Sequence, residues 1–365
     1  MDRDEALAFL AKAPVVRLAS TTGDGSPILR TVHGVIVDDF LCFHGAPAGE
    51  KMEAIGREAV LCAEETVASI PSYFVDPQRA CPATTFYQSV QVHGVIEQID
   101  DAAFKARVLS TLMTKFQPEG GHVPIEVDHP LYKRAIEGIL VLAVRLERLD
   151  GKKKVGQNRS PEERARLIER LWERGDAGDL RAIELVRASA KTPTPRFLAA
   201  PEGVTLTCQP HGDDDVRGAV AMLADAYWNA PSINAEELAT AHRRSTAWVG
   251  ARDASGALCA TARAISDGAK HAWIYDVMVR EGFRGRGLGT AVTRLLLDHP
   301  AVRGARFVWL GTRDAMPVYE KLGFIARAAL PKKPYATTEM VLVRRPLAAA
   351  SAESPGDSLR SDAQA

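Results

Sequence analysis

The sequence has no surplus of charge of either sign. Its 365 residues include 46 lysines and arginines and 46 aspartates and glutamates, so the formal net charge is zero. Nucleic acids and anionic membranes attract proteins largely through a surplus of positive charge. We therefore expect neither nucleic acid nor membrane as a partner.

Cysteine pairs and long apolar runs are missing as well. The five cysteines are scattered, with no CxxC pair and no histidine at zinc-finger spacing. This pattern is typical of reduced thiols, so we predict no disulfide and no bound metal. No run approaches eighteen apolar residues, and the opening residues 2–5 (DRDE) are charged rather than the basic and apolar start of a signal peptide. We predict a soluble, cytoplasmic protein.

Length and proline content predict two domains. Pro193, Pro195 and Pro201 lie in "KTPTPRFLAAPEG", and prolines disfavour helix at and before their positions, so residues 191–203 are predicted to be a linker. Residues 348–365 are small and polar and are predicted to be a disordered tail. No internal repeat relates the two halves.

Many short strand-like runs between turn signals predict a β-barrel over residues 1–160. Helical patterns are expected at 3–11, 49–59 and 101–116. Ser160, followed by proline and by a glutamate three positions on, forms the pattern of a capping box. This pattern predicts a helical extension of the barrel over residues 161–190.

The second domain, residues 204–347, alternates strand and helix patterns. Their order is β, α, α, β, β, β, α, β, α, β, with the last strand near "TEMVLVRR" at 338–345. This order predicts a mixed α/β sheet. The overall fold class is therefore α+β, or mixed.

The stretch "FRGRGLGTAV" at 283–292 places three glycines and two arginines before a helical pattern. A helix N-terminus presents free N–H groups and partial positive charge, and glycines let a pyrophosphate approach the backbone closely. The stretch predicts a phosphate site. The alternative is a tight strand-to-helix turn with surface arginines.

About thirty residues downstream lies "GTRDAMPVYEKLGF", at 311–324. Together the two segments resemble the GCN5-related N-acetyltransferase (GNAT) superfamily, which binds acetyl-CoA. The resemblance covers residues 204–345 and implies a sulfur-facing Tyr319 and a pantetheine-binding strand. The coenzyme A residues that it implies are Val277, Met278, Val279, Arg284, Gly285, Arg286, Gly287, Leu288, Gly289 and Thr290.

An amine attacks a thioester only as the free base, so some group must take its proton. Asp276 is a candidate base, directly or through water, and a strand N–H near Val277 is a candidate oxyanion donor. Tyr319 is a candidate acid for the leaving thiolate. The structural alternatives are an ion pair for Asp276 and a half-buried aromatic residue for Tyr319. Tyr227 and Trp228 are candidates for the substrate pocket, or for the core.

In the first domain, "PILRTVHGVIVDDFLCFHGAPAGEKMEAIG" at 27–56 brings Lys51 next to glycines at a predicted helix start. Such a start is a second candidate phosphate site. The pattern resembles the split-barrel flavoproteins related to pyridoxamine 5'-phosphate oxidase, of the nitroimidazole-resistance type, which bind FMN. The FMN-site residues that it implies are Arg30, Thr31, Val32, Lys51, Gln88 and Ser89.

The two resemblances predict a two-domain enzyme, an N-acetyltransferase for a small amine fused to an FMN-binding, oxidoreductase-like barrel. The resemblance to split barrels implies a homodimer. A flavin-dependent nitro or amine oxidoreductase as the main activity, serial chemistry on one nitrogen compound, and a ligand-sensing regulator without catalysis remain open alternatives. In the barrel, haem bound through His33, His44 or His93 is an alternative to flavin.

Overall fold

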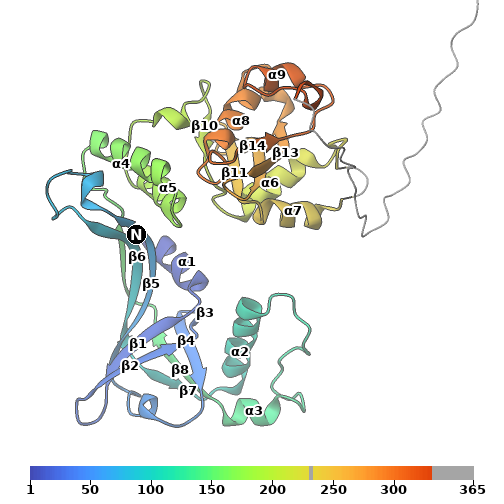
Figure 1. Ribbon diagram of the computed structural model, residues 1–365. Helices are drawn as coiled ribbons and strands as arrows, with labels where there is room; N and C mark the ends of the chain where they lie inside the picture. The colour runs from blue at the N-terminus through green and yellow to red at the C-terminus, as the bar shows by residue number, and fades with distance from the viewer. Residues whose placement is uncertain (230–232, 331–365) are drawn as a thin grey trace, which may run out of the picture. The chain divides into compact units, whose positions relative to one another are not determined.

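The computed structural model describes residues 1–229 and 233–330, and the chain divides into two compact units. Residues 1–167 and 177–191 form the first unit, and residues 168–176 join the chain from 192 onward in the second. Figure 1 follows the chain through each unit. The strand predicted at 338–345 and the tail predicted at 348–365 lie outside the described residues.

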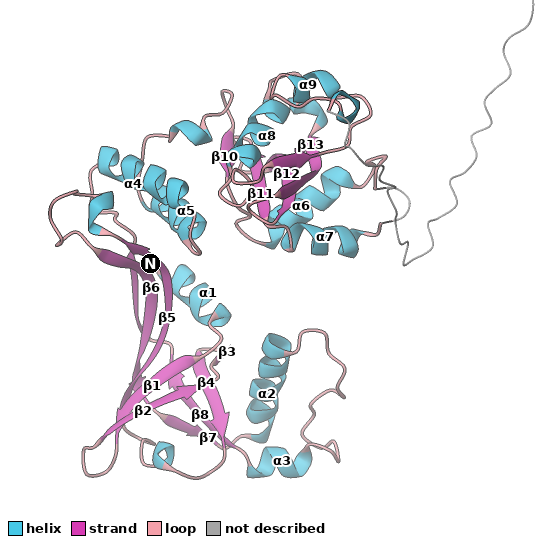
Figure 2. Cartoon of the chain, viewed as in Figure 1, coloured by secondary structure: helices cyan, strands magenta, loops and turns pink. Residues whose placement is uncertain are grey.

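The first unit is a barrel split into two antiparallel sheets (Figure 2). One sheet has the order β2 (Pro27–Val32), β1 (Val16–Thr21), β5 (Glu58–Ile70), β6 (Thr84–Val95) and β9 (Arg148–Lys154). The other has the order β3 (Val35–Val37), β4 (Phe40–Gly45), β8 (Leu140–Arg145) and β7 (Glu97–Ile99). The predicted barrel is confirmed.

Apolar residues that alternate along these strands form the core of the barrel. Helix α1 (Arg3–Lys12) adds Leu10 to a cluster with Leu61 and Leu142, which come from the two different sheets. Helix α2 (Ala102–Phe116) packs a second cluster onto the four-stranded sheet, and the short α3 (Lys133–Gly138) follows it. The helices predicted at 3–11 and 101–116 are therefore present.

The helix predicted at 49–59 is wrong. Only the 3-10 turn Glu50–Met52 forms there, and β5 already begins at Glu58. Gly49 and Gly56 have φ values of 83° and 78°, in the left-handed region that helices do not use. The two glycines close off the segment at both ends, so the apolar residues between them cannot continue as a helix.

Two helices follow the barrel, α4 (Pro161–Arg174) and α5 (Asp179–Ser189). The predicted capping box starts α4. The Glu163 amide donates to Ser160 Oγ at 3.2 Å, and the Ser160 amide donates to the Glu163 carboxylate at 2.9 Å. Two of the amides at the start of α4 are thereby satisfied.

The second unit is a sheet with helices on its two sides (Figure 1). Its strand order is β10 (Thr205–Thr207), β11 (Ala247–Arg252), β12 (Leu258–Ser266), β13 (His271–Val279) and β14 (Phe307–Trp309). Only the β13–β14 pair is parallel among the described strands. The helices are α6 (Asp213–Leu223), α7 (Ala235–Arg243), α8 (Leu288–Asp298) and α9 (Met316–Glu320). The predicted mixed sheet is confirmed.

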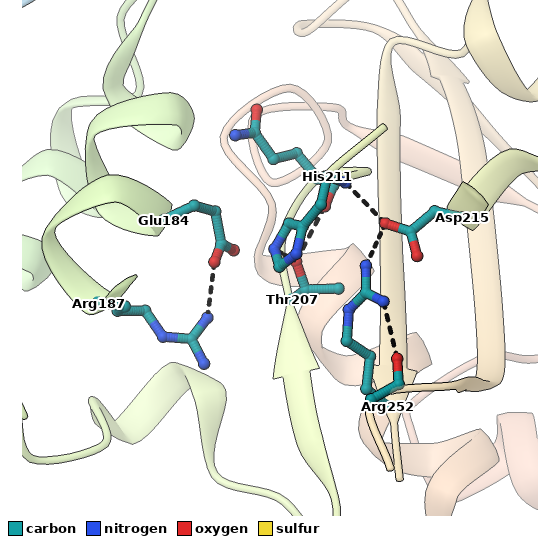
Figure 3. A network of polar contacts seen from close by, with 8 residues as sticks. Glu184, Arg187, Thr207, His211, Asp215 and Arg252 are labelled. Atoms are coloured by element: carbon teal, nitrogen blue, oxygen red, sulfur yellow. Dashed lines mark hydrogen bonds and ion pairs between the residues drawn. The ribbon is translucent and has the colours of Figure 1, made fainter. Parts of the chain in front are cut away.

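A buried carboxylate fixes the first turn of α6 to the sheet (Figure 3). Asp215 accepts hydrogen bonds from the Arg252 guanidinium of β11 and from the His211 amide, the latter at 2.7 Å. The His211 ring also lies 3.1 Å from Thr207 Oγ1. This network joins β10, β11 and α6. Figure 3 also shows a Glu184–Arg187 pair on α5 of the first unit.

Candidate functional site

The glycine-arginine stretch forms an open loop between β13 and α8. Gly285 and Gly287 have φ values of 75° and 78°, and Gly287 is the N-cap of α8. Leu288, Val292 and Leu295 are buried, and α8 packs on the sheet through this apolar face. The packing of α8 on the sheet therefore fixes the position of the helix N-terminus and of the loop that precedes it.

The backbone of this loop is free to bind a ligand. Among the described residues, no protein acceptor takes a hydrogen bond from the amides of residues 285–290. A Cβ atom added to Gly285 or Gly287 would meet no atom within 4 Å. Arg284 Nε donates to Val279 O at 3.3 Å, and one guanidinium nitrogen of Arg286 donates to Glu202 O at 2.9 Å. Free amides and two arginines suit two linked phosphates.

Strand β13 carries a bulge beside this loop. Thr261 pairs with Met278, but Arg263 pairs with Tyr275, so β13 contains one extra residue at this point. Asp276 lies in the bulge with a φ of 53°, which is uncommon for a residue other than glycine. The sequence indicated Asp276 as a candidate base, but it did not predict the bulge.

Strands β13 and β14 separate after three paired residues. Their register runs from His271–Trp273 on β13 to Phe307–Trp309 on β14, and no described pairing between the two continues past it. Val277, Met278 and Val279 thus have β12 on one side and an open edge on the other. An extended chain with amide groups can pair with such an edge.

Asp276 is the hub of a buried polar cluster. One carboxylate oxygen accepts a hydrogen bond from Trp228 Nε1 at 2.9 Å, and the other is ion-paired with Arg263 Nε at 2.5 Å. The Asp276 side chain is only 2% exposed. An ion-paired carboxylate with both oxygens engaged is poorly placed to take a proton from a substrate.

His242 of α7 completes this cluster. Its Nδ1 accepts a hydrogen bond from Trp248 Nε1 at 3.1 Å, and its Nε2 lies 3.7 Å from an Asp276 oxygen. Burial lowers the pKa of His242 to about 4, and the charge of Arg263 acts in the same direction. The ring is therefore neutral at pH 7, with its proton on Nε2. Sequence reasoning missed His242 and Arg263, although a lone arginine in the buried run "LCATARAIS" was a signal.

Tyr319 lies on α9 and lines a cavity of about 560 Å³ together with residues of β14. Burial raises the pKa of its phenol, and the nearby Tyr227 and Asp314 raise it further. The phenol therefore keeps its proton at neutral pH, as a proton donor must. Tyr227 thus lies within electrostatic reach of Tyr319.

Tyr227 and Trp228 lie in the turn after α6, which ends at Leu223. Their rings meet edge to face at a centroid distance of 4.9 Å. The Arg313 guanidinium stacks on Tyr227 at 3.7 Å, a contact that the sequence did not indicate. Both aromatic side chains are more than two-fifths exposed, so they belong to the surface and not to the core.

The predicted FMN-phosphate residues of the barrel are already engaged. Arg30 of β2 is ion-paired with Glu50, and Lys51 Nζ donates to Ala48 O at 2.8 Å. The helix expected to start here is only the turn Glu50–Met52. A carboxylate on the phosphate-binding arginine competes with a phosphate, so FMN binding here would require Glu50 to leave Arg30.

Apart from Lys51, the predicted flavin residues lie on two strands, β2 and β6, that are not neighbours in the sheet. Arg30 pairs with Leu18, which pairs with Leu61, which pairs with Val92 on β6. Gln88 is therefore three strands across from Arg30 and four positions along β6, with Ser89 beside it. Thr31 and Val32 continue β2 next to Arg30. Buried Gln88 donates to Glu65 at 3.0 Å.

The histidines considered for haem have protein surroundings. His93 is ion-paired with Asp150 at 3.0 Å, and His33 packs edge to face on Phe116. Burial lowers the pKa of His44, and His33 contributes to the shift. None of the described helices is long and apolar enough to cross a membrane.

Comparison with known proteins identifies both units. The acetyltransferase (GNAT) family model matches residues 219–324, and that of pyridoxamine 5'-phosphate oxidase matches residues 2–153. The C-terminal unit is thus a GNAT acetyltransferase domain. The chain as a whole fuses this domain to an N-terminal pyridoxamine 5'-phosphate oxidase-like split barrel.

Individual relatives match single domains. A mycothiol acetyltransferase from Corynebacterium glutamicum is 46% identical over 55 residues, which are 14% of this chain and 19% of that protein. A putative GNAT acetyltransferase from Xanthomonas campestris is 27% identical, with a TM-score of 0.32, over 38% of this chain and 96% of its own. A putative 5-nitroimidazole resistance protein from Bacteroides thetaiotaomicron is 17% identical, with a TM-score of 0.34, over 41% and 82%.

Proposed function

We propose that the C-terminal domain transfers the acetyl group of acetyl-CoA to the nitrogen of a small amine. The observation that carries the proposal is the row of amides at residues 285–290, at the N-terminus of α8, for which the described part of the chain supplies no acceptor. Such a row suits the pyrophosphate of coenzyme A. The open edge at Val277, Met278 and Val279 suits the amides of the pantetheine arm.

In the proposed reaction, the neutral amine attacks the thioester carbonyl, a C–N bond forms and the C–S bond breaks. An N–H near Val277, at the bulge, stabilises the oxyanion. Tyr319 gives its proton to the leaving thiolate and is reprotonated through solvent by the proton that the amine loses. Its raised pKa keeps the phenol protonated before the step.

Asp276 has two possible roles in this reaction, base or clamp. By clamp we mean a residue that holds the bulge and the Trp228 indole in place. The bonds of Asp276 to Arg263 and Trp228 favour this role. Asp276→Asn separates the two roles through the pH profile of kcat/KM. Loss of a base removes the acidic limb of the profile, whereas loss of a clamp lowers the whole curve.

Calorimetry with acetyl-CoA and with CoA tests the proposal directly. We expect both ligands to bind, because the phosphates and the pantetheine arm are common to them. Inorganic pyrophosphate should compete with both. Release of CoA thiol in the presence of a panel of amines then measures transfer. An absence of heat at millimolar ligand would remove the transferase proposal.

A second proposed function belongs to the barrel, which matches a family of flavin enzymes. We propose FMN binding across a homodimer. The proposed residues Arg30 and Gln88 lie on β2 and β6, which β1 and β5 separate within the sheet. A second copy would complete the site, and Glu50 would have to leave Arg30. When bound, a flavin supplies redox chemistry, and Arg30 and Lys51 would hold its phosphate.

A further inference from the structure

Four exposed aromatic residues lie near the bulge of β13. They are Tyr227 (45% exposed), Trp228 (42%), Trp273 (45%) and Tyr275 (39%), and we call them the aromatic surface. Single exposed aromatic side chains are ordinary, but a contiguous group is typical of a binding site. The question is which ligand these rings recognise.

Contacts link the aromatic surface to the proposed point of acyl transfer. Trp228 is hydrogen-bonded to Asp276, the bulge residue, and Tyr275 precedes it in the chain. Trp273 stacks near Tyr275 at a centroid distance of 6.4 Å and an interplanar angle of 23°. Tyr227 meets Trp228 at 4.9 Å. The rings thus form two pairs, one bonded to Asp276 through Trp228 and the other next to Asp276 in the chain through Tyr275.

Two arginines lie over these rings, and the two carboxylates that contact those arginines are paired with them. Arg263 lies over the Tyr275 ring at 4.9 Å, and Arg313 lies over Tyr227 at 3.7 Å. Asp276 is paired with Arg263, and Asp314 is paired with Arg313 at 3.2 Å. A polyamine would meet two guanidiniums here, with neither carboxylate free to bind a second ammonium. The uncharged ring of an aromatic ligand can pack against these side chains without needing a free carboxylate.

We propose, on the basis of the acetyl transfer proposed above, that the acceptor is a primary amine attached to an aromatic ring system. The ring lies against the aromatic surface, and the amino group lies at the bulge. Offset or edge-to-face contact with Trp and Tyr rings contributes beyond the burial of area alone. Selectivity for the ring therefore comes from this surface and not from a charged pocket.

The test compares tryptamine, n-butylamine and spermidine as acceptors, with saturating acetyl-CoA at one pH and CoA release as the readout. We expect kcat/KM for tryptamine to exceed that for n-butylamine by about tenfold or more, with spermidine no better than n-butylamine. Trp228→Ala and Tyr275→Ala should bring the ratio toward one. Leu131→Ala, which removes an exposed apolar side chain of the barrel, should leave it unchanged.

Trp228→Phe keeps a ring but loses the N–H to Asp276, so it should retain most of the ratio even if the alanine variant folds poorly. A tryptamine ratio near one in a protein that binds acetyl-CoA would overturn this inference alone. A lack of acetyl-CoA binding would overturn the proposed function, and this inference with it. Alanine variants that lower Tm without changing the ratio would show a packing face instead and also overturn it.

Discussion

The two predicted phosphate loops look alike in sequence but differ in structure. Before α8, glycines with positive φ lead into an eleven-residue helix, and the amides that follow have no described protein acceptor. In the barrel, Gly49 also has positive φ but leads only into the three-residue turn Glu50–Met52. There Arg30 and Lys51 are already engaged by Glu50 and by a backbone carbonyl.

The difference teaches that glycine and positive charge do not by themselves define an anion site. An anion needs donors without partners and a helix long enough to orient them. The transferase loop has both. In the barrel, the cations Arg30 and Lys51 are present, but the Glu50 carboxylate and the Ala48 carbonyl already bind them.

The largest effect that we expect comes from Gly287→Val. A β-branched residue is strained at a φ of 78°, so the loop should change conformation and acetyl-CoA binding should fall by roughly a hundredfold or more. Calorimetry measures this loss.

The matched control is Gly256→Val, because Gly256 has a φ of 83° in the β11–β12 turn and the same open space around its Cβ position. This variant should lose a little stability and no affinity. Equal losses of affinity in both variants would contradict a specific role for the loop.

Tyr319→Phe should lower kcat by roughly a hundredfold with little change in KM, because the leaving thiolate loses its proton donor. A phenol donates only below its pKa. Since burial raises that pKa, the alkaline limb of the wild-type profile should lie above pH 10 and disappear in the variant. Tyr73→Phe, at an exposed tyrosine of the barrel, is the control. An unchanged kcat would rule out Tyr319 as the acid.

The smallest effect concerns the barrel. Glu50→Gln removes the carboxylate from Arg30, so FMN should bind a few-fold more tightly, as expected for an exposed ion pair. Quenching of FMN fluorescence measures the affinity. Glu53→Gln, in the same segment but not paired with Arg30 among the described contacts, should have no effect. If the purified protein is colourless, and if FMN does not raise the Tm of the Glu50→Gln or the Glu53→Gln variant, the barrel does not bind a flavin.

The sequence predicted the features that depend on local rules. The Ser160 capping box and the order of strands and helices in the second domain depend on hydrogen bonds and periodicity within short segments. The structure contains the capping box, and it contains the predicted order as far as α9. The helix at 49–59 failed because its two glycines adopt positive φ, and spacing alone does not reveal φ. A run of helix-forming residues between them was a misleading signal.

The Asp276 cluster could not be predicted for a different reason. Arg263, His242 and Trp228 come from β12, α7 and the turn after α6, and only the folded sheet brings them to one carboxylate. Tyr319 was predictable as a residue because of its motif. Its raised pKa was not, since that depends on burial and on Tyr227 across the site.

Because β13 and β14 separate early, a bound cosubstrate could contribute to the stability of the folded domain. After Trp273, no described strand pairs with β13 on the β14 side. A cosubstrate that pairs with this edge would act as an additional strand, so its binding energy would count toward folding. The acetyl-CoA-loaded domain should therefore resist heat and protease better than the free one.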